Sequence, residues 1–122
     1  MECEVELKKR VLELSETTLE GLEHIRVRTS NGHFEETFSL FYDTVNSFHE
    51  MVKVIQPMLS ELKQNMLEEK AAQVTRGMDL LLSAYEGSAG MPPLEILQFT
   101  LLPKYRDWQR ELKDALEPFI VS

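Results

Sequence analysis

Apolar residues recur every three or four positions over most of the chain, which is the spacing of amphipathic α-helices. The pattern predicts four helices, over roughly residues 3–28, 34–59, 67–85 and 93–118. No stretch shows the alternation of apolar and polar residues that is typical of a half-buried strand. The sequence therefore predicts an all-α fold.

The second predicted helix has the most regular pattern. Its apolar positions alternate spacings of four and three, which is a heptad seam that favours the shallow crossing angle of left-handed bundles. The seam consists of Phe34, Phe38, Phe41, Val45, Phe48, Val52, Ile55 and Leu59. We expect Phe41, Val45 and Phe48 to be largely buried.

Short polar segments separate the four helices. Asn31-Gly32 can take the positive φ of a turn, and Gly87 is the usual left-handed stop after a helix. Asn65 followed by Glu68 reads as a capping box at the start of the third helix.

Prolines and glycines mark special positions inside the helical patterns. We expect Pro57 to kink or end its helix, Pro103 to cause a kink near Leu102, and Pro118 to end the last helix. Gly21 and Gly77 lie inside helices, and close approach of a neighbouring helix would explain both. The four helices predict an antiparallel up-down-up-down four-helix bundle with proline-kinked helices, forming a single domain over residues 1–122.

The second helix carries more apolar surface than its seam requires. Tyr42 lies off the seam, and so do Leu40, Met51, Val54 and Met58, which cluster along one flank of the helix. A central helix that touches two neighbours would explain this breadth. The alternative is that the flank is an exposed interface, covered by a second copy or by a helix of a partner protein.

Composition and charge exclude several partners. The 122 residues are 43% hydrophobic and 28% charged, with a net charge of −8, so anionic partners such as nucleic acid and anionic membrane are disfavoured. No apolar run is long enough for a signal peptide or a spanning helix, and we expect a cytoplasmic protein. Cys3 is the single cysteine, so no intramolecular disulfide can form.

No residue pattern indicates catalysis, a cofactor or a metal. A carboxylate-bridged metal site in a bundle needs Glu-x-x-His, which none of His24, His33 and His49 completes. His49-Glu50 begins like a zinc-protease helix, but Lys53 stands where the second histidine would be. The glycines are scattered and no nucleophile has a visible partner. We therefore expect no enzymatic activity, no cofactor and no metal.

Two parts of the sequence are similar to a known group of proteins. Residues 83–86 and 95–108, with the segment 31–36 at the start of the second helix, resemble a family of uncharacterised small helical proteins from Bacillus-like Gram-positive bacteria. The resemblance implies no activity and no site. In size, acidity and heptad pattern only, the chain is also similar to flagellar export chaperones, which hold a partner's helix in a groove.

Three functional hypotheses follow from these features. The first is a non-enzymatic interaction protein, such as an adaptor, chaperone or regulator, that binds a helix of another protein. The second is a structural homodimer that self-associates through the flank of Leu40, Met51, Val54 and Met58. The third is an enzyme or small-ligand binder with a pocket near Trp108 and Tyr85.

Overall fold

A computed structural model describes the backbone of residues 2–120 and the side chains of residues 4–120, so the side chain of Cys3 lies outside the described part. The chain forms α1 (Glu2–Ser30), α2 (Phe38–Ile55), α3 (Leu67–Tyr85), α4 (Pro93–Ile96) and α5 (Leu102–Ile120). Short 3-10 turns, η1 (Phe34–Thr37) and η2 (Gln56–Glu61), flank α2, and a π-helical turn, η3 (Leu97–Leu101), joins α4 to α5. The chain is 87% helical, and no strand occurs among the described residues, which confirms the all-α prediction.

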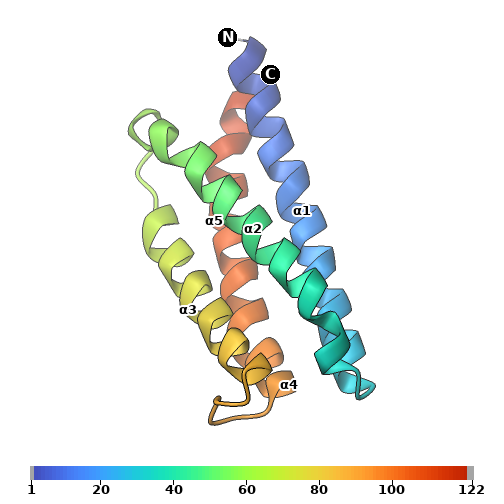
Figure 1. Cartoon of the computed structure of the whole chain (residues 1–122). Helices are drawn as coiled ribbons and strands as arrows, with labels where there is room; N and C mark the ends of the chain where they lie inside the picture. The colour runs from blue at the N-terminus through green and yellow to red at the C-terminus, as the bar shows by residue number, and fades with distance from the viewer. Residues whose placement is uncertain (1, 121–122) are drawn as a thin grey trace.

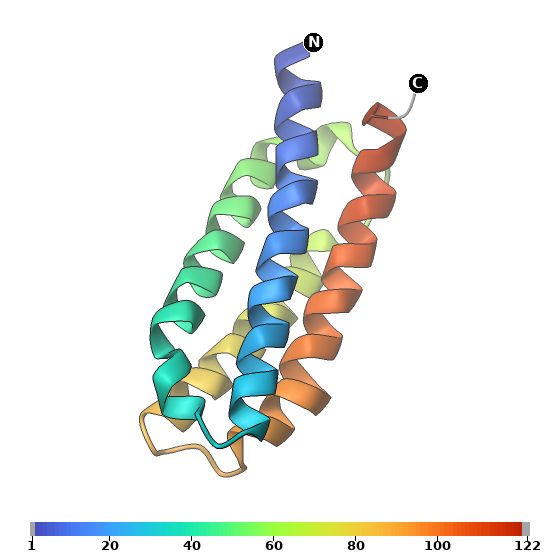
Figure 2. The same cartoon turned by 90° about the vertical axis from the view of Figure 1, so that its right-hand side faces the viewer.

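The helices run alternately down and up, as predicted (Figure 1). Helix α1 lies between α2 and α5, and α3 packs against α5 on the side away from α1 (Figure 2). The described ends of the chain lie at the same end of the bundle, opposite the α1–α2 and α3–α4 connections. The order around the bundle is therefore α2, α1, α5, α3. The remaining two neighbours, α2 and α3, close the ring.

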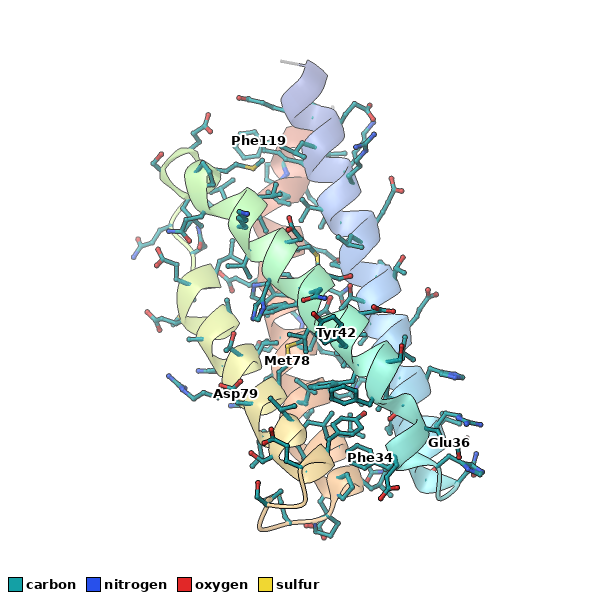
Figure 3. All side chains as sticks on the ribbon, viewed as in Figure 1. Phe34, Glu36, Tyr42, Met78, Asp79 and Phe119 are labelled. Atoms are coloured by element: carbon teal, nitrogen blue, oxygen red, sulfur yellow. The ribbon has the colours of Figure 1, made fainter. Side chains whose placement is uncertain are left out.

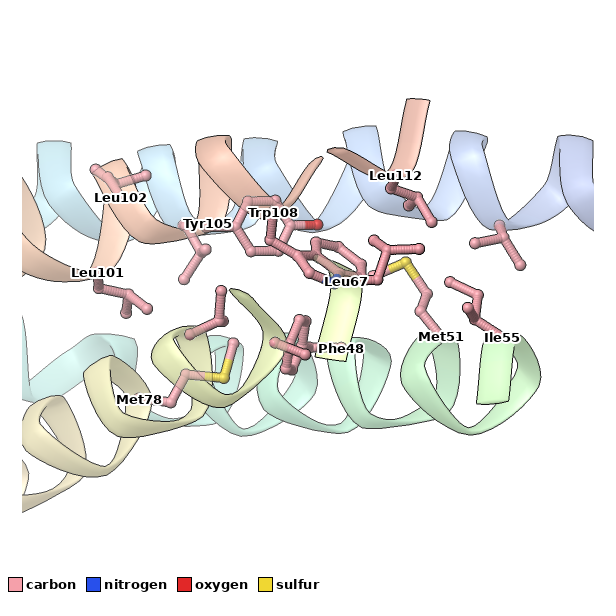
Figure 4. Packing of buried hydrophobic residues seen from close by; sticks show 14 of the residues in the cluster. Phe48, Met51, Ile55, Leu67, Met78, Leu101, Leu102, Tyr105, Trp108 and Leu112 are labelled. Atoms are coloured by element: carbon pink, nitrogen blue, oxygen red, sulfur yellow. The ribbon is translucent and has the colours of Figure 1, made fainter. Parts of the chain in front are cut away.

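The core centres on a cluster of rings from α2 and α5 (Figure 4). Phe48 meets Trp108 edge-on with centroids 4.8 Å apart, and Tyr105 lies 5.4 Å from the same indole. The Tyr105 hydroxyl donates to the carbonyl of Ser15 at 2.7 Å, which ties α5 to α1. Such packed aromatic pairs supply much of the buried area of a small domain.

The buried face of α2 is rotated from the predicted seam. The buried residues of this segment still follow spacings of four and three, and they are Thr37, Phe41, Thr44, Phe48, Met51, Ile55 and Met58. The prediction is confirmed for Phe41 and Phe48, whereas Val45 is half-buried and Phe38 is 44% exposed. The helix thus turns one flank of its seam inward and leaves the other flank partly uncovered.

This rotation also corrects the expected interface flank. Met51 is 1% exposed and Met58 7%, while Leu40 and Val54 are half-buried. The flank packs inside the chain because α1 comes very close to α2 at Gly21. Without a side chain at this position, Thr44 and Leu40 can approach α1, and a Cβ on residue 21 would lie 2.8 Å from Thr44 Cγ2. These four residues are therefore not an exposed patch.

Gly77 confirms the second expected close approach. A Cβ at this position would lie 3.3 Å from the Cα of Leu101, so α3 packs directly on the backbone of η3. Alanine is the better helix former, and glycine is needed here because any side chain would press against that backbone.

The prolines behave differently from one another. Helix α2 ends two residues before Pro57, and the chain continues as the 3-10 turn η2. Before Pro103, which has no N–H to donate, the helix widens into η3, and the Leu102 N–H bonds to the Leu97 carbonyl. The prediction for Pro118 is wrong, since α5 continues through it to Ile120.

Both turn glycines take the expected conformation, with φ of 85° at Gly32 and 77° at Gly87. At the start of α3, the Asn65 side-chain oxygen accepts from the Leu67 N–H at 3.0 Å, although the N-cap residue is Met66 rather than Asn65. The carboxylate that completes this helix start is Glu111 of α5 and not Glu68, because Glu111 accepts from the Met66 N–H at 3.0 Å.

Candidate functional site

The seam between α2 and α3 is the open side of the bundle. Helix α2 packs on α1 and α3 packs on α5, but α2 and α3 have little direct contact with each other. A hollow of about 260 Å³ lies between them, and Figure 3 looks onto this side of the molecule. The residues lining the hollow are Phe38, Phe41, Tyr42, Val45, His49, Thr75, Met78, Asp79 and Leu82. We call this seam, with its hollows, the α2–α3 groove.

The groove has a buried apolar floor and exposed apolar walls. Phe41 and Met78 form the floor and are 3% and 2% exposed. Tyr42 on α2 is 60% exposed, and Leu82 on α3 is 37% exposed. Large apolar side chains on facing walls are typical of a surface that another molecule covers.

An aromatic cluster closes the groove beside the α3–α4 connection. The rings of Phe34 and Tyr85 stack with centroids 4.0 Å apart, and Phe38 and Phe41 lie 5.2 Å and 5.1 Å from Tyr85. The hydroxyl groups of Tyr85 and Thr37 share a hydrogen bond of 2.6 Å. Burial of the phenol raises the pKa of Tyr85 to about 12. The cluster holds the ends of α2 and α3 at a fixed separation.

The opposite end of the groove is nearly filled. A hollow of only about 20 Å³ lies there, between Val52 and Leu59 of the α2 side, Leu67 and Ala71 of α3, and Trp108 of α5. Trp108 itself is 1% exposed. The sequence placed a possible ligand pocket near Trp108 and Tyr85, but these residues line separate hollows, and the one at Trp108 has room for little more than a water.

Carboxylates line the edges of the groove. Glu68, Asp79 and Glu86 lie along α3, and Glu35 lies at the start of the α2 side. His49 is the one basic side chain among the described residues that line these three hollows. At the η2 end of α3, Lys63 lines a neighbouring hollow together with Glu68. The surface is therefore apolar in the middle, with three carboxylates on the α3 side and one, Glu35, on the α2 side.

Within residues 4–120, no three histidine, cysteine or acidic side chains are grouped so that they could hold a metal ion. No described helix is both long and apolar enough to cross a membrane. What the groove offers is apolar contact area with a charged margin.

The predicted interface residues do not line the groove. Leu40, Met51, Val54 and Met58 are on the other flank of α2, toward α1. Of the apolar surface that the sequence singled out on α2, Tyr42 is the residue exposed in the groove. On α3, Leu82 lies outside the apolar stripe from Leu67 to Tyr85, and this off-stripe leucine is the signal that could have indicated the second wall.

Comparison with known proteins gives one match. Residues 6–111 match the model of a family described as a domain of unknown function, DUF8042. No curated protein and no solved structure matches the chain.

Proposed function

The chain belongs to the DUF8042 family, and we propose that it is a non-enzymatic interaction protein that binds an amphipathic helix of another protein in the α2–α3 groove. The observation that carries this proposal is the open seam of the bundle, with exposed apolar side chains on both walls. Binding of an amphipathic helix in an apolar groove is a common mode of peptide recognition.

The dimensions of the groove suit a helix. The 19 residues of α3 span about 28 Å, so a partner helix of five turns can lie alongside α3. Its apolar side chains would enter the open hollow of about 260 Å³ in the middle of the groove, because the aromatic cluster closes one end and the other end is nearly filled. A helix seated there would complete the helical packing around Phe38, Tyr42 and Leu82. Full burial of each such side chain contributes roughly 1.5–3 kcal/mol relative to exposure in water.

Three further expectations from the sequence concern where the protein acts, the organisms it comes from and its role in the cell. A cytoplasmic location, an origin in Bacillus-like bacteria and a chaperone-like role are proposals supported by the sequence patterns and resemblances alone. The likeness to flagellar export chaperones agrees with helix binding, but it is an analogy of size, acidity and pattern.

Photo-crosslinking tests the proposed binding surface. Position 42 on the groove wall and position 99, a phenylalanine that is 73% exposed outside the groove, would each receive the aromatic photo-crosslinker p-benzoylphenylalanine. We expect one partner protein to be crosslinked in the native cell from position 42 and not from position 99. The crosslinked partner segment should also bind the purified chain as an isolated helical peptide. Crosslinking that is equal at both positions, or absent at 42, would contradict the proposal.

Self-association through the groove is the competing hypothesis, and light scattering over a concentration series separates the two. We expect a monomer at every concentration. A dimer that Tyr42→Glu with Leu82→Glu dissociates, and that Phe99→Glu leaves intact, would assign the groove to a second copy and overturn binding of a different protein.

A further inference from the structure

The carboxylates at the edge of the groove indicate the charge of the helix that binds there. Resting on the proposed function, we infer that the α2–α3 groove binds a basic amphipathic helix, with lysine or arginine along the edge that faces α3. Apolar residues of this helix would fill the hollow between Phe41 and Met78, and its basic edge would lie against the carboxylates of α3.

Two carboxylates of α3, Glu68 and Asp79, share one edge of the helix with Glu86, the residue that directly follows it. Glu68, Asp79 and Glu86 are separated by 11 and 7 residues, and at 100° per residue they stay within about 20° of one another around the axis. The first and last are about 27 Å apart along the helix. A partner helix lying alongside α3 would meet all three, and basic residues at the same heptad-like spacing would match them.

Cross-helix ion pairs occur on other seams of the bundle and are missing from this one. Between α5 and α1, Arg106 bonds to Glu23, and Lys113 lies 2.9 Å from Glu16. Between α3 and α5, Lys70 lies 3.1 Å from Glu111. Within residues 4–120, no ion pair joins α2 to α3. Among the described residues, Glu68, Asp79 and Glu86 form no ion pair with any side chain of the chain.

The same charges argue against a second copy as the occupant. A two-fold dimer whose axis runs across the groove would place α3 of one copy against α3 of the other, and so bring Glu68, Asp79 and Glu86 toward the carboxylates of the second copy. Like charges placed opposite each other disfavour association, and each copy already has a net charge of −8. A different protein with a basic helix fits the margin better.

The opposite wall makes the expected helix asymmetric. On the α2 side, the exposed side chains of Phe38, Tyr42 and His49 line the hollow opposite Asp79, and no carboxylate does. The one carboxylate on this side is Glu35, which lies at the end of the groove in the hollow that Glu86 also lines. The edge of the bound helix that faces α3 should therefore be basic. The edge that faces α2 should be uncharged, with side chains that pack against aromatic rings.

Two designed peptides test this inference by fluorescence anisotropy. Both are amphipathic helices of about 21 residues with the same leucine seam, and one edge carries lysines in the first peptide and glutamates in the second. We expect the lysine-edged peptide to bind at least about tenfold more tightly, because several attractive pairs replace repulsive ones. The difference should decrease as salt concentration rises.

A matched pair of variants locates the charge effect. Asp79→Lys with Glu86→Lys changes the edge of the groove, whereas Glu13→Lys with Glu20→Lys makes the same change in net charge on exposed positions of α1. We expect the first double variant to lose the preference for the lysine-edged peptide and the second to retain it. Equal loss in both variants would show a general charge effect and overturn the inference.

The outcomes also distinguish this inference from the proposed function. Equal binding of the two peptides in the groove, abolished by Tyr42→Glu with Leu82→Glu, would overturn the basic partner and leave helix binding supported. Binding of neither peptide would overturn helix binding in this groove and the charge preference together.

Discussion

The rings of Phe34 and Tyr85 stack with their centroids 4.0 Å apart, and they connect the turn before α2 to the last residue of α3. At this end of the bundle, a ring pair rather than interlocking helix faces sets the separation of α2 and α3. The groove is held open beside it because neither helix can close on the other without displacing the rings.

The hydrogen bond of Tyr85 gives a first stability prediction. Tyr85→Phe keeps the ring stack and removes the bond to Thr37, whose hydroxyl still donates to the Phe34 carbonyl. We expect a loss of about 0.5–1.5 kcal/mol at neutral pH, measured by chemical denaturation. An unchanged stability would mean that the bond contributes nothing beyond the stack.

The raised pKa of Tyr85 adds a pH dependence to the same comparison. Burial raises its pKa from 10.0 to about 12, so the folded state holds the phenol proton more tightly than the unfolded state. Stability from this group is present below pH 10 and is lost as the pH rises toward 12. The advantage of the wild type over Tyr85→Phe should therefore shrink over this range, and an advantage that grows there would contradict the assignment.

Gly77 should not tolerate a methyl group. Gly77→Ala would bring a Cβ to 3.3 Å from the Leu101 Cα, so α3 or η3 must shift. We expect a net loss of roughly 1–3 kcal/mol, despite the better helix propensity of alanine. Gly90→Ala is the control, because nothing lies within 4 Å of a Cβ at that position. Thermal unfolding of the two variants should differ clearly.

The two flanks of α2 should respond in opposite ways to charge. Met51 is 1% exposed, so Met51→Glu buries a carboxylate in the core and should unfold the chain or lower its melting temperature strongly. Tyr42 is 60% exposed, and Tyr42→Glu should leave helicity and melting temperature nearly unchanged. Circular dichroism with thermal melting measures both, and a stable Met51→Glu variant would show that this flank is not core.

Glu111 should make stability sensitive to acid. The Met66 N–H, followed by Lys70, holds the pKa of Glu111 below its usual value of 4.5. A lowered folded-state pKa contributes stability above the unfolded pKa, and that contribution is lost as the pH falls through the folded value. Glu111→Gln should cost about 1 kcal/mol at neutral pH. Its difference from the wild type should shrink below pH 4.5, and a difference that stays constant there would contradict the assignment.

Local patterns in the sequence were sufficient to predict the helices. Apolar spacing, Asn65 at the start of α3 and the glycines at positions 32 and 87 act through the backbone and near neighbours, so they need no knowledge of the fold. Gly21 and Gly77 also indicated close helix approach correctly. The partner in that approach, and the Glu111 carboxylate that helps to cap α3, come from distant parts of the chain and could not be read locally.

The site was decided by the tertiary structure. Beside Phe41, Phe48 and Ile55, helix α2 has two apolar flanks, one carrying Met51 and the other Val45, and periodicity alone favours neither. Because the missing side chain of Gly21 lets α1 approach the first flank, that flank is buried and the second is left facing α3. Hydrophobic spacing determines which residues avoid water, but only the positions of neighbouring helices determine which of them remain to bind something else.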